Sequence, residues 1–193
     1  MKGILLKKNG FTLVELLVVI AIIGILSTMG YAGLQGAVEN NRVKDAALNI
    51  TAFLERVSNE ANRMSKTLCL KKESDTRLGI YEGNCSALGG SSSPLFDFNL
   101  EPPMKFVAEC PSFECDEDDG ACNGANWIGS AGADFKPKFG LSAAPSSGYV
   151  CAQYGSTSHF AAALKRKSEN TIHATMGYGT GDGRDSDVGM DDL

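Results

Sequence analysis

The residue near the start of the chain with the strongest need for a partner is Glu15, a carboxylate at the entrance of a long apolar run. A charged side chain is costly in apolar surroundings, so an unpaired carboxylate at this position requires a nearby cation. The nearest candidate is the amine that would form if the chain were cut between Gly10 and Phe11. The position of Glu15 therefore makes such an amine its candidate counterion.

The apolar run itself covers residues 16–34, which are 19 positions without a charged side chain or a side-chain amide. A helix of that length is roughly 28 Å long, close to the hydrocarbon thickness of a bilayer. Lysines at positions 2, 7 and 8 precede the run and place the N-terminus in the cytoplasm. A secretory signal peptide has a shorter apolar core, and a simple anchor leaves Glu15 unexplained. We therefore expect a membrane-spanning helix within residues 11–36 and export of the rest of the chain.

Residues 10–26 read Gly-Phe-Thr-Leu-Val-Glu-Leu-Leu-Val-Val-Ile-Ala-Ile-Ile-Gly-Ile-Leu, which closely resembles the N-terminal signature of type IV prepilins and type II secretion pseudopilins. The resemblance implies that residues 1–10 are a leader peptide, which prepilin peptidase removes before it methylates Phe11. It also implies that Glu15 neutralises the amine of Phe11, in its own chain or in a neighbouring subunit, and so sets the register of subunits in a filament. Loss of the three leader lysines would lower the basic count from 18 to 15 against 23 acidic side chains, a formal charge of −8.

Residues 37–66 have an amphipathic pattern in place of the uniformly apolar one. No proline occurs before Pro94, so the helix can continue through them. An apolar stripe in alternating steps of four and three indicates one buried face, formed by Val43, Ala47, Ile50, Leu54, Val57, Ala61, Met64 and Leu68. A coiled coil uses the same spacing, but the two alanines in the stripe favour packing on a sheet. Glycines at positions 24, 30, 33 and 36 allow either a bend or close packing against another helix.

The last predicted domain, residues 67–193, has short apolar runs separated by turn residues and ends in an acidic tail. Strands are expected at 67–72, 77–81, 95–99, 105–109, 138–142, 149–154, 160–165 and 171–176. The predicted fold class is therefore α+β, with a long N-terminal helix packed on an antiparallel β-sheet. The order of elements resembles that of H-type minor pseudopilins and FimT-like minor pilins, in which the second half of the helix lies against a sheet.

Six cysteines lie in this domain, and they are Cys69, Cys85, Cys110, Cys115, Cys122 and Cys151. An even number in an exported domain predicts disulfides, without fixing the pairing. Cys69 with Cys85 would join two strands, and Cys115 with Cys122 would close a short acidic loop. Zinc is disfavoured because no Cys-x-x-Cys occurs and His159 and His173 have no ligand-like neighbours in the sequence.

Calcium is the one cofactor that the acidic residues suggest. The loop at 114–119 and the tail residues Asp182, Asp185 and Asp187 are rich in oxygen ligands and, in the tail, in flexible glycine. Neither stretch has EF-hand spacing, and acidic termini are usually solvated. We therefore expect no cofactor, with the tail as the better calcium candidate.

Composition and missing motifs exclude several classes of function. With 193 residues, 43% hydrophobic, the chain is too apolar for a wholly disordered protein. A net charge of −5 argues against a dedicated nucleic-acid binder, since the basic stretches 71–72 and 165–167 are short and fit solvated strand ends. No hydrolase, nucleotide-binding or zinc-protease motif occurs, so we expect no enzymatic activity.

The sequence thus predicts a non-enzymatic structural subunit of a type II secretion pseudopilus or a type IV pilus. It would lie in the inner membrane with its N-terminus in the cytoplasm and its C-terminal domain in the periplasm. The implied partners are prepilin peptidase, other pilins or pseudopilins, the inner-membrane assembly platform and membrane lipid, and nucleic acid is not expected. The alternative is a minor tip pilin that binds DNA, a surface or a carbohydrate.

Overall fold

The computed structural model describes residues 11–88, 93–108, 125–157, 159–167, 169–178 and 191–192, without the side chains of 29–33, 178, 191 and 192. Contacts divide the chain into two compact units, Met1–Val38 and Glu39–Leu193. The boundary between the units falls inside a single long helix, α1, which spans Leu13–Met64. The predicted helix is therefore present, and it ends two residues earlier than expected.

The C-terminal end of α1 is closed by a Schellman motif. Ser65 follows the helix in the left-handed conformation, with φ of 50°. The N–H of Ser65 donates to the carbonyl of Asn62 (3.2 Å), and the N–H of Lys66 donates to the carbonyl of Ala61 (3.2 Å). These two bonds satisfy carbonyls that the helix itself leaves unpaired. They turn the chain directly into the first strand.

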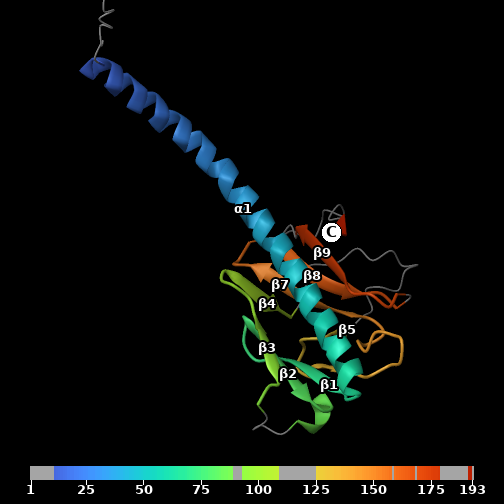
Figure 1. Cartoon of the computed structure of the whole chain (residues 1–193). Helices are drawn as coiled ribbons and strands as arrows, with labels where there is room; N and C mark the ends of the chain where they lie inside the picture. The colour runs from blue at the N-terminus through green and yellow to red at the C-terminus, as the bar shows by residue number, and fades with distance from the viewer. Residues whose placement is uncertain are drawn as a thin grey trace, which may run out of the picture. The chain divides into compact units, whose positions relative to one another are not determined.

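The strands that follow α1 form two sheets (Figure 1). The first has the order β3-β2-β1-β6, from Phe96–Asn99, Arg77–Glu82, Leu68–Lys72 and Ala133–Phe135. The second has the order β10-β9-β8-β7-β4, from Asp191–Asp192, His173–Tyr178, His159–Lys165, Gly148–Tyr154 and Met104–Val107. A short strand β5, Ala125–Asn126, pairs with β7 in parallel, and the other described pairings are antiparallel. A 3₁₀ turn, η1, spans Cys85–Ala87.

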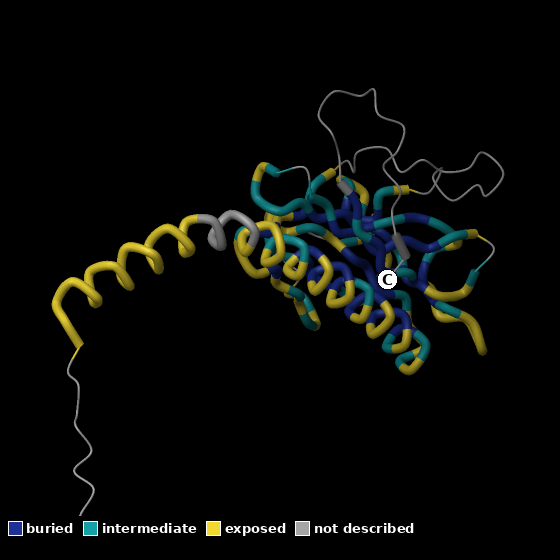
Figure 2. The backbone as a smooth tube through the Cα atoms, turned by 90° about the horizontal axis from the view of Figure 1, so that it is seen from above, coloured by how far each residue is buried: buried dark blue, intermediate teal, exposed yellow. Residues whose placement is uncertain are grey.

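One hydrophobic core joins both sheets to the second half of α1. The predicted stripe is confirmed from Val43 to Ala61, where its members are all buried, and Leu68 is buried at the start of β1, whereas Met64 at the helix end is only half-buried. They pack with residues of the first sheet, such as Ile80, and of the second, such as Val150. Within residues 39–64, Figure 2 shows buried positions on the side of α1 toward the strands and exposed positions on the other side. The structure is therefore an α+β fold, as expected.

Three details of the β domain differ from the prediction. The structure has two sheets where one was expected, and strands β5, β6 and β10 were missed because each is only two or three residues long. The predicted strand at 138–142 is wrong: these residues form a loop in which Gly140 has φ of +68°. An L-residue strand cannot continue through that conformation. The other seven predicted strands are confirmed to within two residues at each end.

Candidate functional site

The predicted processing site lies at the boundary of the described residues. Gly10 falls outside them, whereas Phe11 is described and its side chain is 80% exposed. Since α1 begins at Leu13, an amine on Phe11 would lie beside the first helical turn. The N–H groups of that turn already carry a partial positive charge, which favours a carboxylate nearby. Glu15 is the acidic residue in that turn.

Sequence interpretation missed the cap of this helix, which Thr12 provides. The backbone N–H of Glu15 donates to the Thr12 hydroxyl oxygen (3.3 Å), and the N–H of Leu16 donates to the Thr12 carbonyl (3.2 Å). Thr-x-x-Glu is the sequence signature of a capping box, so residues 12–15 already contained the signal. Thr12 thus fixes the start of α1 and places Glu15 at its third position.

The polar side chains described further along this apolar part of α1 bond to their own helix. The Ser27 hydroxyl donates to the carbonyl of Ile23 (2.7 Å), and the Thr28 hydroxyl donates to the carbonyl of Ile25 (2.7 Å). Such bonds remove the need for water and suit a helix in apolar surroundings. For the Glu15 carboxylate, no cation lies within ion-pair distance among the described residues. Glu15 is therefore the polar group of this stretch that needs a partner from elsewhere.

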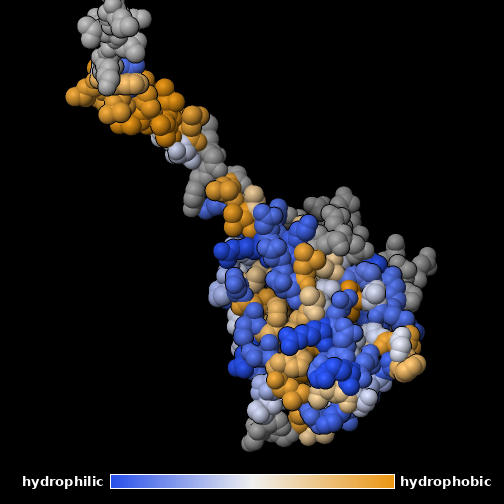
Figure 3. All heavy atoms as spheres, viewed as in Figure 1, coloured by the Kyte–Doolittle hydropathy of each residue, from blue (hydrophilic) through white to orange (hydrophobic). Residues whose placement is uncertain are grey.

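Apolar side chains surround Glu15 on the first unit and are exposed. They appear orange in Figure 3, and they are Leu13, Val14, Leu16, Leu17, Val18, Val19, Ile20, Ile22, Ile23, Ile25 and Leu26. The predicted span at 16–34 lies partly outside the described residues, since the side chains at 29–33 are not included. In the part of α1 that can be assessed, the apolar stretch falls short of what a membrane crossing requires.

The cysteine predictions are confirmed where the structure describes them. Cys69 and Cys85 form a disulfide that ties η1 to β1, with their Cα atoms 5.0 Å apart. Cys151 is also disulfide-bonded, while Cys110, Cys115 and Cys122 lie outside the described residues. Asp134 lies close to both sulfurs of the first bridge. Sulfurs joined in a disulfide offer no thiolate, so this group does not fit a metal site.

Of the other predicted site residues, the structure describes only the two histidines. The calcium candidates Asp182, Asp185 and Asp187 and the acidic loop at 114–119 lie outside the described residues. His159 and His173 each face one carboxylate: the Nδ1 of His159 is 4.0 Å from Glu39, and the Nε2 of His173 is 2.5 Å from Glu169.

The basic stretch at 165–167 is less available than expected. Lys165 is a buried residue of β8, only 4% exposed, and its ammonium donates to the carbonyl of Ser146 (3.4 Å). The prediction of a solvated strand end is therefore wrong for this lysine. On the other stretch, Lys72 pairs with Asp75 (2.9 Å). Neither stretch presents the continuous basic surface that phosphate contacts need.

Comparison with known families identifies the N-terminal segment. Residues 5–31 match the prokaryotic N-terminal methylation motif, which includes Gly10, Phe11, Thr12 and Glu15. Comparisons with curated proteins and with solved structures found no match. The motif and the long N-terminal helix agree with the resemblance drawn from the sequence. The match covers 27 of the 193 residues, so it supports a likeness to type IV pilins and pseudopilins in the N-terminal segment.

Proposed function

We propose that the protein is a non-enzymatic structural subunit of a type II secretion pseudopilus or a type IV pilus. Prepilin peptidase cuts it between Gly10 and Phe11 and methylates Phe11, and the first half of α1 then enters the filament. The observation that carries the proposal is Glu15, a carboxylate without a described counterion on a helix whose nearby hydroxyls bond to their own backbone. The amine of Phe11 supplies the missing charge in the proposed filament.

The proposed topology follows from the same segment. The basic leader stays in the cytoplasm, residues 11–36 lie in the inner membrane before assembly, and residues 67–193 lie in the periplasm. The partners are prepilin peptidase, the assembly platform, lipid and other pilins. The role needs no cofactor, since the work of assembly comes from the platform. Binding of calcium by the tail would appear as heat in a titration of the full-length protein, and a flat titration would exclude it.

The proposed role of Glu15 is tested by Glu15→Gln. Glutamine keeps the size and the capping ability of the side chain but removes its charge. We expect normal cleavage, seen as loss of residues 1–10 by mass spectrometry, with little of the variant in sheared filaments. Thr12→Val is the matched variant, because it removes the cap and keeps the carboxylate. Glu101→Gln, at an exposed position of the β domain, controls for the loss of one charge.

The outcomes separate the two roles of Glu15. Filament incorporation of Glu15→Gln at the wild-type level would contradict the proposed ion pair. If Thr12→Val failed to assemble and Glu15→Gln assembled normally, Thr12 and Glu15 would contribute only by capping α1, and the charge of Glu15 would not be needed. An uncut N-terminus in the wild-type protein would refute the filament proposal as a whole.

A further inference from the structure

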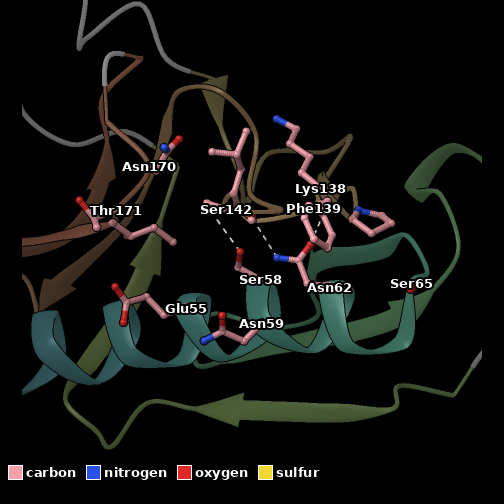
Figure 4. A pocket seen from close by; sticks show the side chains of 14 residues that line it. Glu55, Ser58, Asn59, Asn62, Ser65, Lys138, Phe139, Ser142, Asn170 and Thr171 are labelled. Carbon is pink, nitrogen blue, oxygen red and sulfur yellow. Dashed lines mark hydrogen bonds between the residues drawn. The ribbon is translucent and has the colours of Figure 1, made fainter.

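A groove of about 740 Å³ lies on the β domain beside the last turns of α1 (Figure 4). Glu55, Asn59 and Asn62 of α1 form one wall. The loop at 137–142, called here the Phe139 loop, forms the facing wall, and Thr171 lies two residues before the start of β9. The groove belongs wholly to the second unit of the chain, and the proposed processing and filament-core segment does not include it.

The Phe139 loop is held against α1 by side chains of the helix. The Asn62 side chain accepts a hydrogen bond from the N–H of Lys138 (2.7 Å) and donates one to the carbonyl of Leu141 (2.9 Å). One turn earlier, the Ser58 hydroxyl accepts from the N–H of Ala143 (2.8 Å). The loop is therefore fixed before any partner arrives, so binding there costs little further ordering.

The fixed loop presents an apolar side chain to solvent. Phe139 is fully exposed, at 107% of the reference accessibility, and Leu141 beside it is half exposed. An aromatic side chain of this kind buries about 150–250 Å² when a partner covers it. Fixed, exposed aromatic residues are characteristic of the centres of protein contacts. The pairing of this side chain with an adjacent groove indicates a docking surface.

The charges on the two walls have opposite signs. Glu55 lies on the helix wall and Lys138 on the loop wall, and neither forms an ion pair with another described residue. The loop wall is thus positive and the helix wall negative. A second copy of the same chain carries the complement of each wall.

We propose that this surface is the contact between the globular domains of two copies of this chain in the filament. Phe139 of one copy enters the groove of the next, and Lys138 of the first copy faces Glu55 of the second. This inference rests on the proposed function. A single aromatic side chain and its surroundings bury far less than the roughly 1,200 Å² of a stable interface. The contact therefore forms only between copies that their helices already hold together, where the effective concentration is high.

The test places the photoreactive analogue p-benzoylphenylalanine at position 139 of the full-length chain, in cells that assemble the filament. We expect a crosslinked product of two copies, with the second attachment point within residues 55–62 or 137–142. The matched control carries the same analogue at Leu95. This residue is about as exposed to solvent as Leu141, but it does not line the groove. It should give no product attached at those residues.

Charge reversal tests the orientation of the contact. Glu55→Lys or Lys138→Glu alone should lower the yield of the crosslinked product about two- to five-fold, a loss of the size expected when one exposed ion pair is removed. The double variant should restore the yield, because each copy again offers opposite charges. Incorporation into filaments without the product, or without rescue by the double variant, overturns the inference and leaves the filament role intact. Failure of the wild-type chain to enter any filament overturns the proposed function, and this contact with it.

Discussion

Replacement of Ser58 by alanine should lower the stability of the β domain more than replacement of Asn62, although Asn62 makes more bonds to the same loop. Ser58 is only 5% exposed, and its hydroxyl accepts the N–H of Ala143, which is 1% exposed. In Ser58→Ala that N–H remains buried without an acceptor. Its desolvation costs about 1–3 kcal/mol. The Ser142 hydroxyl, 3.1 Å from that of Ser58, also loses a neighbour.

Asn62 acts where water can replace it. Its two bonds reach Lys138 and Leu141, which are both exposed. When Asn62→Ala removes these bonds, water hydrates the freed groups, so each bond is worth only about 0.5–1 kcal/mol. The two bonds of Asn62 together are worth about 1–2 kcal/mol, and the middle of that range lies below the middle of the about 1–3 kcal/mol expected for Ser58. The larger loss of stability is therefore expected at the more buried residue, although that residue makes fewer bonds to the loop.

The measurement is thermal unfolding of the full-length protein in detergent, followed by tryptophan fluorescence. Trp127 is the only tryptophan of the chain and is buried in the core, so its emission reports on the β domain. A loss of about 2 kcal/mol corresponds to a fall of roughly 4–8 °C in Tm for Ser58→Ala. Ser146→Ala, at an exposed position, should leave the Tm unchanged. A Tm for Asn62→Ala below that of Ser58→Ala would refute the reasoning.

Two further predictions concern the core of the same domain. Burial lowers the pKa of Lys165 from its usual 10.5, so the charged form disfavours folding at neutral pH. Lys165→Met should therefore raise the Tm at pH 7, and this gain should shrink as the pH rises toward 10.5, because the wild-type lysine then loses its charge. Removal of the bridge in the double variant Cys69→Ala, Cys85→Ala opens a loop of 16 residues and should cost about 3 kcal/mol, seen as a lower urea midpoint. An unchanged midpoint would show that the bridge does not stabilise the fold.

The sequence was sufficient for the parts of the fold that periodicity controls. The stripe from Val43 to Ala61 repeats over many turns, so its burial could be predicted and is confirmed. The loop at 137–142 could not be predicted in the same way. Its partner Asn62 is 76 residues away, and a local pattern contains no information about a contact at that distance. Lys165 was misjudged because five consecutive residues of β8 are buried, which requires that both faces of the strand are covered.

The same distinction between local pattern and distant contact applies to the two candidate sites. Gly10, Phe11, Thr12 and Glu15 are neighbours in the chain, so their spacing is sufficient to indicate their chemistry. The groove beside Phe139 depends on α1, a loop and the residues just before β9, which come together only in the folded domain. The first site could therefore be predicted from the sequence, whereas the groove could not.

The exposed apolar side chains of the first unit suggest a physical role for the charge of Glu15. The core of the second unit begins at Val43, while the large apolar residues described from Phe11 to Leu26 are exposed. Lipid and a bundle of identical helices both cover apolar side chains, so apolar contact alone gives no preference for the filament over the bilayer. In the proposed filament Glu15 changes this balance, because a neighbouring amine would neutralise it and a lipid tail would not. Under that proposal, the carboxylate favours assembly over remaining in the membrane.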